Sequence, residues 1–156
     1  MLILVVRLEI GDFTTDKYEE KLDPLKETTI DKITNHPDII HAGFQKDIRP
    51  YLVMMDVFIF PSYREGFGVS IMEASAMGVP VISSDISGCN EIITDGVNGL
   101  LIKPRSSEDL KKVMSFIKKE ITIRKKMANQ ARENVAKKYE QNIVWDAIET
   151  YYKKRA

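Results

Sequence analysis

Residues 56–84, DVFIFPSYREGFGVSIMEASAMGVPVISS, contain the pattern that decides the fold. DVFIFP (56–61) is β-branched and aromatic and ends at a proline, which predicts a buried strand. FGVSIMEASAMG (67–78) predicts a helix, with Gly78 just beyond its last turn. VPVISS (79–84) predicts the next strand. A strand, a helix and a second strand in this order predict a parallel β-α-β unit.

The same alternation continues on both sides of this unit. Upstream, the sequence predicts a strand at 2–6, a helix at 23–33 with Asp23 as N-cap and Pro24 at its first position, a short strand at 38–43 and a helix at 48–55. Downstream, it predicts a turn of helix at 89–93, a strand at 100–102 and helices from Ser106 to the end. These helices carry three apolar stripes: the first is Leu110, Val113, Met114 and Ile117, the second is Met127, Ala131 and Val135, and the third is Ile143, Val144, Ala147, Ile148 and Tyr151. We therefore expect an α/β fold: a Rossmann-like doubly wound parallel sheet with helices on both faces and a helical C-terminal tail, in one domain spanning 1–156.

Composition is typical of a soluble globular protein. Of the 156 residues, 44% are hydrophobic and 29% are charged. No apolar run approaches the roughly 20 residues that a membrane-spanning helix needs. The single cysteine, Cys89, excludes an internal disulfide and fits a reducing compartment, so we expect a cytoplasmic protein.

Charge is divided unevenly along the chain although the formal net charge is zero. Residues 103–156 carry 15 Lys/Arg against 7 Asp/Glu, a net charge of +8, and residues 1–102 balance it with −8. Solvated faces of the C-terminal helices are the simplest interpretation. A basic surface near anionic lipid is the alternative. Aromatic and basic residues are not interleaved, so we do not expect a nucleic-acid partner.

The loop 61–68 and the helix after it have the composition of an anion site. Gly66 and Gly68 allow the main chain to approach a ligand, and a helix N-terminus presents free amides and a positive dipole to phosphate. The third position of a dinucleotide fingerprint is Ile71, so that motif is absent.

Two carboxylates flank this turn. Glu65 precedes it, and Glu73 lies inside a small, mostly apolar helix, where a buried carboxylate needs hydrogen-bond donors. A vicinal diol offers two such donors, as ribose and sugars do. Each glutamate alone is more simply a surface residue, but both beside a phosphate site indicate a nucleotide-sugar site.

Other conspicuous side chains have simpler interpretations. His36 and His41 stand at no telling distance from a nucleophile or carboxylate, which favours packing or surface positions. Cys89 has no base near it in the sequence and is expected to be inert. Trp145 and Tyr152 on the last helix fit either the core or a surface that docks onto another domain.

The segment REGFGVSIMEASAMGVPVISSDISGCNEIITDGVNGLLIKP (64–104) resembles the donor-binding segment of family 4 glycosyltransferases, which have the GT-B fold. The shared features are two glutamates eight positions apart, the Gly-Phe-Gly turn, A-x-G-x-P-V-I, N-E-I-I and D-G-x-N-G-L-L. GFQKDIRPYLVMMDVFIFPSYREGF (43–67) also resembles sugar transferases of bacterial capsule or lipopolysaccharide assembly.

The resemblance implies a role for particular residues. Glu65 would be the catalytic-site carboxylate that contacts hydroxyls of the donor sugar, and Glu73 would hold the ribose. Glu91 would shape the neighbouring loop. The donor sugar and diphosphate would bind to the main-chain amides of Gly66, Phe67, Gly68 and Val69, and the nucleobase would lie near Gly43, Phe44 and Gln45.

The resemblance also implies the reaction. It predicts transfer of a sugar from a UDP- or GDP-linked donor to a glycan or lipid-linked acceptor, with retention of anomeric configuration, without a bound metal or cofactor, at or near the inner face of the membrane. The family's N-terminal acceptor domain, the first strand of this domain and an upstream Arg/Lys pair have no counterpart here. We therefore expect a truncated C-terminal half that is inactive alone. The alternatives are a stand-alone nucleotide-binding or interaction module, or a GT-B relative such as a sugar-nucleotide epimerase.

Overall fold

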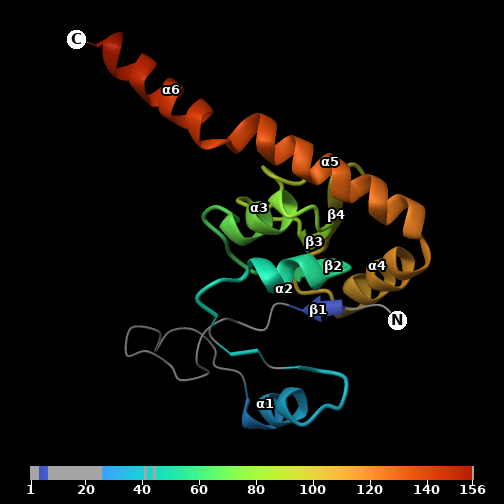
Figure 1. Ribbon diagram of the computed structural model, residues 1–156. Helices are drawn as coiled ribbons and strands as arrows, with labels where there is room; N and C mark the ends of the chain where they lie inside the picture. The colour runs from blue at the N-terminus through green and yellow to red at the C-terminus, as the bar shows by residue number, and fades with distance from the viewer. Residues whose placement is uncertain (1–3, 7–25, 41, 44, 156) are drawn as a thin grey trace. The chain divides into compact units, whose positions relative to one another are not determined.

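The computed structural model describes residues 4–6, 26–40, 42–43 and 45–155 (Figure 1). They fall into two compact units, one formed by residues 1–6 with 49–156 and the other by residues 7–48. The larger unit contains a parallel sheet of four strands, in the order β1 (Leu4–Val6), β2 (Val57–Phe60), β3 (Val81–Ser84) and β4 (Gly99–Ile102). Its helices are α2 (Arg49–Met54), α3 (Val69–Ala76), α4 (Ser107–Lys119), α5 (Ile121–Tyr139) and α6 (Gln141–Lys153).

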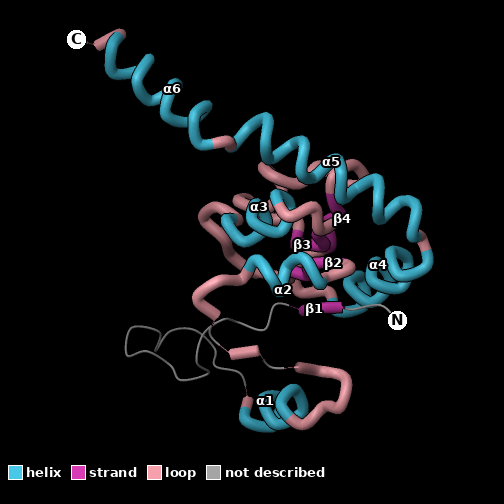
Figure 2. The backbone as a smooth tube through the Cα atoms, viewed as in Figure 1, coloured by secondary structure: helices cyan, strands magenta, loops and turns pink. Residues whose placement is uncertain are grey.

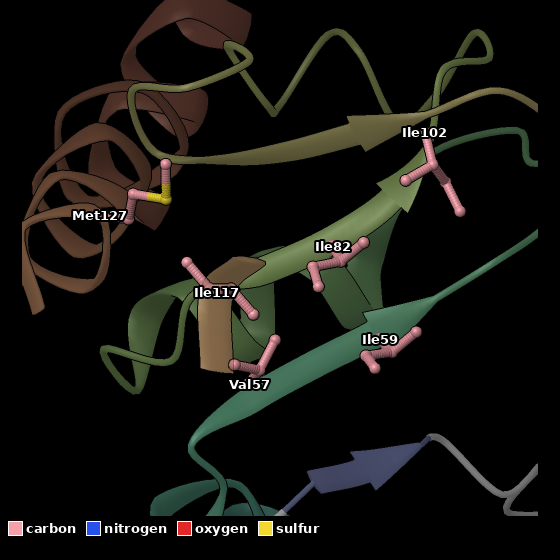
Figure 3. Close-up of a cluster of buried hydrophobic side chains, with 6 residues drawn as sticks. All are labelled: Val57, Ile59, Ile82, Ile102, Ile117 and Met127. Atoms are coloured by element: carbon pink, nitrogen blue, oxygen red, sulfur yellow. The ribbon is translucent and has the colours of Figure 1, made fainter. Parts of the chain in front are cut away.

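One face of the sheet carries the apolar core. The sheet register places Ile59 beside Ile82 and Ile82 beside Leu100. These positions and the neighbouring ones on the same face pack against α4 and α5 in a buried cluster, whose labelled members in Figure 3 are Val57, Ile59, Ile82, Ile102, Ile117 and Met127. Leu110, Val113 and Met114, which belong to the first predicted apolar stripe, are partly buried and pack against this cluster.

The opposite face is covered as well. Phe58 and Phe60 alternate with the core residues along β2, so they point to the other side of the sheet, and both are buried. Helix α3 packs against β2, β3 and α5, and buries Ile71 and Ala74. Both β2 and β3 are covered on both faces, which is why each strand consists only of apolar or small residues. The predicted fold, with helices on both faces, is confirmed.

The last three helices differ in how much they bury. Helix α4 begins at the N-cap Ser106, whose Oγ accepts a hydrogen bond of 3.1 Å from the Asp109 amide. Helix α5 buries Met127 and Ala131, as its stripe predicted. Helix α6 follows α5 and points away from the sheet (Figure 2). It buries no side chain: Trp145 is 59% exposed and Tyr152 is 69% exposed, so the core interpretation of these two residues is wrong. No helix in the described ranges is both long and apolar enough to span a bilayer.

The unit of residues 7–48 contains helix α1 (Glu27–Thr34), preceded by Lys26 as N-cap. The predicted start of this helix at Asp23 and Pro24 lies outside the described residues. The predicted strand at 38–43 is wrong, because Asp38–Ile40, Ala42 and Gly43 belong to no strand and Ile40 is 85% exposed. His41 is outside the described residues, and His36 is an exposed residue whose Nδ1 accepts from the Asp38 amide at 3.2 Å.

The segment predicted as a turn of helix at 89–93 consists of consecutive hydrogen-bonded turns between Ile86 and Ile93. Two main-chain bonds there have the i to i+4 spacing of a helical turn. The Asn90 amide donates to the Ile86 carbonyl at 3.1 Å, and the Ile93 amide donates to the Cys89 carbonyl at 3.0 Å. These turns occupy the connection between β3 and β4, next to the loop that follows β2.

Candidate functional site

Two loops meet at the carboxyl edge of the sheet. Residues 61–68 follow β2 and residues 85–98 follow β3, and the carboxyl ends of parallel strands face the same edge, where ligands bind in folds of this class. A main-chain hydrogen bond joins the loops, with the Gly68 amide donating to the Gly88 carbonyl at 2.9 Å.

Gly68 and Gly88 allow the two loops to approach this closely. A β-carbon on Gly88 would stand 2.7 Å from the Glu65 carbonyl oxygen and 3.0 Å from that of Gly66, and Gly88 has a φ of +81°. A β-carbon on Gly68 would stand 2.8 Å from Cδ1 of Ile71 and 3.0 Å from the Gly88 carbonyl oxygen. Both glycines are therefore required by contact between the loops.

The amides of the Gly-Phe-Gly turn divide into two groups. Gly68 has φ −74° and ψ 65°, and the Val69 amide donates to the Phe67 carbonyl at 2.8 Å, which is an inverse γ-turn. In the described part of the chain, the amides of Gly66, Phe67 and Ser70 donate to no other group. The expectation that all of Gly66–Val69 offer amides to a ligand needs correction: Gly68 and Val69 use theirs within the protein.

Gly66 differs from the other two glycines of the site. Its absent β-carbon would meet no atom within 4 Å, and its φ is not in the left-handed region. Neither packing nor local conformation requires a glycine at this position. The space beside its Cα, where a side chain would stand, is therefore open, and a ligand can approach the main chain there.

Glu65 is half-buried at the base of this site. The Ser62 hydroxyl donates to the Arg64 carbonyl at 3.0 Å and lies 3.5 Å from Oε2 of Glu65, so its single proton leaves the carboxylate largely free to accept from a ligand. Beneath the loop, the Ser83 hydroxyl donates to the Phe60 carbonyl at 3.0 Å and fixes the end of β2 against β3.

Cys89 lies wholly buried beside these groups. Burial raises the pKa of the Cys89 thiol, a hydrogen bond with Ser83 lowers it in part, and the negative charge of Glu65 raises it further. The thiol is thus held in its protonated form at neutral pH, which agrees with the inert cysteine expected from the sequence.

Glu73 is exposed, whereas the buried side chains of α3 are Ile71, Ala74 and Ser75. The cost of burying this carboxylate, which drew attention to it in the sequence, therefore does not arise. Among the described residues it has no side-chain hydrogen bond or ion pair. A solvent-facing carboxylate in the second turn of α3 is available to accept from a diol.

Glu91 holds the loop after β3 in shape. Its Oε1 accepts from the Ser87 hydroxyl at 3.1 Å and from the Gly88 amide at 3.2 Å. The expected role of Glu91 in shaping this loop is confirmed.

Tyr139, at the end of α5, is the residue of this region that the sequence interpretation missed. Its hydroxyl donates to the Glu91 carbonyl at 3.3 Å, and its ring packs edge-to-face on Phe67 with centroids 5.7 Å apart. The signal was its position four residues after Val135, which continues the spacing of Met127, Ala131 and Val135.

The residues expected near the nucleobase belong to the unit of residues 7–48. Gly43 has a φ of +63°, and Nε2 of Gln45 donates to the Ala42 carbonyl at 2.5 Å. Phe44 lies outside the described residues. Their role at a nucleobase stays a prediction.

Comparisons with known proteins agree on one family. The family model described as "Glycosyl transferases group 1" matches residues 10–134. N,N'-diacetylbacillosaminyl-diphospho-undecaprenol alpha-1,3-N-acetylgalactosaminyltransferase of Campylobacter jejuni is 34% identical over 110 residues, which are 70% of this chain and 29% of that protein. The capsular polysaccharide biosynthesis glycosyltransferase CapM of Staphylococcus aureus is 28% identical over 148 residues, which are 93% of this chain and 37% of that protein.

Among solved structures, Anabaena Alr3699/HepE in complex with UDP and glucose superposes with a TM-score of 0.76 at 23% identity, over 81% of this chain and 35% of that one. This likeness shows the fold. The chain spans about a third of the length of the curated relatives that it matches.

Proposed function

The chain belongs to the group 1 glycosyl transferases, and from this premise we propose that it is the donor-binding part of an enzyme that transfers a sugar from a nucleoside diphosphate sugar with retention of anomeric configuration. The acceptor is a glycan or a lipid-linked sugar, bound by another part of the enzyme. Donor binding is the function that the geometry of this unit supports best.

The observation that carries the proposal is the set of free amides at Gly66, Phe67 and Ser70, between the carboxylates of Glu65 and Glu73. Amides beside a helix N-terminus suit a diphosphate, because they donate hydrogen bonds and the helix dipole favours negative charge. Carboxylates suit hydroxyl pairs, because an ionised carboxylate only accepts. The likeness to the family assigns the ribose to Glu73 and the donor sugar to Glu65 in this proposal.

The same amides would also contribute to catalysis by stabilising the leaving diphosphate. Negative charge grows on the diphosphate as it leaves the sugar, and donors that are already in position stabilise that charge without reorganisation. The chain contains no Asp-x-Asp pair, and the proposal assigns this stabilisation to amides and cations of the protein, with no bound metal.

A UDP- or GDP-linked donor is proposed because the Anabaena protein of the same fold is described in complex with UDP and glucose. A lipid-linked acceptor is supported by the name of the Campylobacter jejuni relative, which contains diphospho-undecaprenol. Such an acceptor lies at a membrane surface, so the proposal includes a cytoplasmic enzyme at the inner face of the membrane, and the +8 charge of residues 103–156 suits anionic lipid.

Titration of the ¹⁵N-labelled chain with UDP, GDP and UDP-glucose tests the proposal. We expect weak binding of one base, with the largest amide shifts at Gly66, Phe67, Ser70 and Glu73, and no sugar transfer by this chain alone. Absence of shifts at these residues with millimolar ligand would contradict donor binding. Shifts confined to residues 121–155 would show that the nucleotide binds elsewhere.

A further inference from the structure

The Gly-Phe-Gly turn contains one side chain that can anchor it. Gly66 and Gly68 have no side chain to hold the turn, so beyond the hydrogen bond from Gly68 to Gly88 the direction of the free Gly66 and Phe67 amides depends on how Phe67 is held. Phe67 is 41% exposed, and its ring contact is with Tyr139, at 5.7 Å and an interplanar angle of 72°. This is the favourable edge-to-face arrangement of two aromatic rings.

The same tyrosine also holds the second loop. The Tyr139 hydroxyl donates to the Glu91 carbonyl at 3.3 Å. Glu91 in turn binds the Gly88 amide through its carboxylate at 3.2 Å, and the Gly88 carbonyl accepts from Gly68 at 2.9 Å. Gly68 directly follows Phe67, so these contacts form a closed circuit that begins and ends at Tyr139.

Tyr139 is the last residue of α5, which is anchored through Met127 and Ala131 in the core and packs against α3. The circuit therefore connects both loops of the site to a rigid helix. We propose that Tyr139 is a positioning residue for donor binding: it fixes the Gly66 and Phe67 amides in the direction that the diphosphate requires, without touching the donor itself. This rests on the donor-binding function proposed above.

The two contacts of Tyr139 can be removed separately. Tyr139→Phe keeps the ring on Phe67 and loses the bond to Glu91, whereas Tyr139→Leu loses both. We expect UDP affinity to fall about 3-fold in Tyr139→Phe, from one lost hydrogen bond, and about 10-fold or more in Tyr139→Leu. The matched control is Val135→Ala, one turn earlier on the same helix and half-buried, which should leave affinity unchanged.

A purely structural role would lower stability and leave the affinity of the folded protein unchanged, so urea unfolding and UDP titration are measured on every variant. In ligand-free protein, Tyr139→Leu should also shift the amide resonances of Gly66, Phe67 and Gly88 and speed their hydrogen exchange. Phe67→Leu should cause a similar loss of affinity. The double variant with Tyr139→Leu should bind UDP only slightly more weakly than either single variant, because both substitutions break the same ring contact.

The outcomes separate the two proposals. If the wild-type chain binds UDP or GDP and Tyr139→Leu binds the same nucleotide with equal affinity, the positioning role is overturned and donor binding stands. If the wild-type chain binds neither nucleotide at millimolar concentration, donor binding is overturned and the positioning role with it. Graded loss from Tyr139→Phe to Tyr139→Leu, at unfolding midpoints like that of Val135→Ala, supports both.

Discussion

Gly88 lies directly against the main chain of Glu65, where a β-carbon would come within 2.7 Å of the Glu65 carbonyl oxygen. Gly88 also has a left-handed φ of +81°, which L side chains rarely adopt. We expect Gly88→Ala to lower the free energy of unfolding by roughly 2–4 kcal/mol, from the strained φ and the displaced loop together. Urea unfolding measures this loss.

Gly66→Ala is the matched comparison, because a β-carbon there would meet nothing within 4 Å. We expect its stability to stay within about 1 kcal/mol of the wild type. Its nucleotide affinity should fall, because the new methyl group would occupy open space beside the main chain where the donor is proposed to bind. Equal stability of the two variants would show that the loops are not packed as described.

The strands at the centre of the fold were predictable because burial on both faces leaves a simple signature. Val57–Phe60 and Val81–Ser84 are short runs between turn signals, and they lie within the predicted ranges 56–61 and 79–84. The apolar residues Ile39 and Ile40 suggested a further strand by the same rule. That inference failed because an apolar run does not specify a ladder partner, and both side chains are exposed.

The site was only partly predictable for a similar reason. Local signals identified Glu65 and the Gly-Phe-Gly turn, which adjoin each other in the sequence. They did not show that the Gly68 amide is donated to Gly88, or that Tyr139 reaches Glu91 from 48 residues away. Such contacts depend on how two loops and a helix pack, which no single segment encodes.

Glu73 is exposed, so replacing its side chain should change nucleotide binding without changing stability. We expect Glu73→Gln to unfold at the same urea concentration as the wild type and to bind UDP about 10-fold more weakly, since a charge-assisted hydrogen bond to the ribose is lost. The wild type should also prefer UDP to 2'-deoxy-UDP. Glu73→Gln should lose most of that preference, and an unchanged preference would assign the ribose to another residue.

The Cys89 thiol should be unreactive in the folded protein. It is wholly buried, and burial and the charge of Glu65 raise its pKa, so little thiolate forms at neutral pH. We expect a thiol-specific disulfide reagent to label the native chain slowly and the urea-unfolded chain at once. Fast labelling of native protein at pH 7 would contradict this.

The Cys89 thiol should make the free energy of unfolding decrease as the pH becomes alkaline. Because the folded-state pKa of Cys89 is raised, the folded protein keeps its thiol proton at pH values where the unfolded chain loses it. The resulting contribution to stability is fully present below the unfolded-state pKa and is lost as pH rises above it. Cys89→Ala should remove this alkaline decline, which urea unfolding from neutral to alkaline pH would detect.

The ion pair between Arg124 and Asp56 joins the start of α5 to the residue before β2, with 3.0 Å between Nη2 and Oδ1. Both side chains are mostly shielded, and in the described residues Nη1 of Arg124 is buried without a hydrogen-bond partner. Removing the carboxylate alone therefore leaves a poorly solvated cation. We expect Asp56→Ala to lower the free energy of unfolding by about 1–3 kcal/mol.

The double variant Asp56→Ala with Arg124→Met should recover part of this loss, because the methionine fills the same space without a charge to solvate. Glu133 and Lys137 provide the surface control: they are 3.7 Å apart and well exposed, so Glu133→Ala should cost less than about 0.5 kcal/mol. Urea unfolding of these variants completes the comparison. A double variant less stable than Asp56→Ala would mean that the Arg124 cation is stabilised by groups other than Asp56, and that the ion pair is not what anchors α5 to β2.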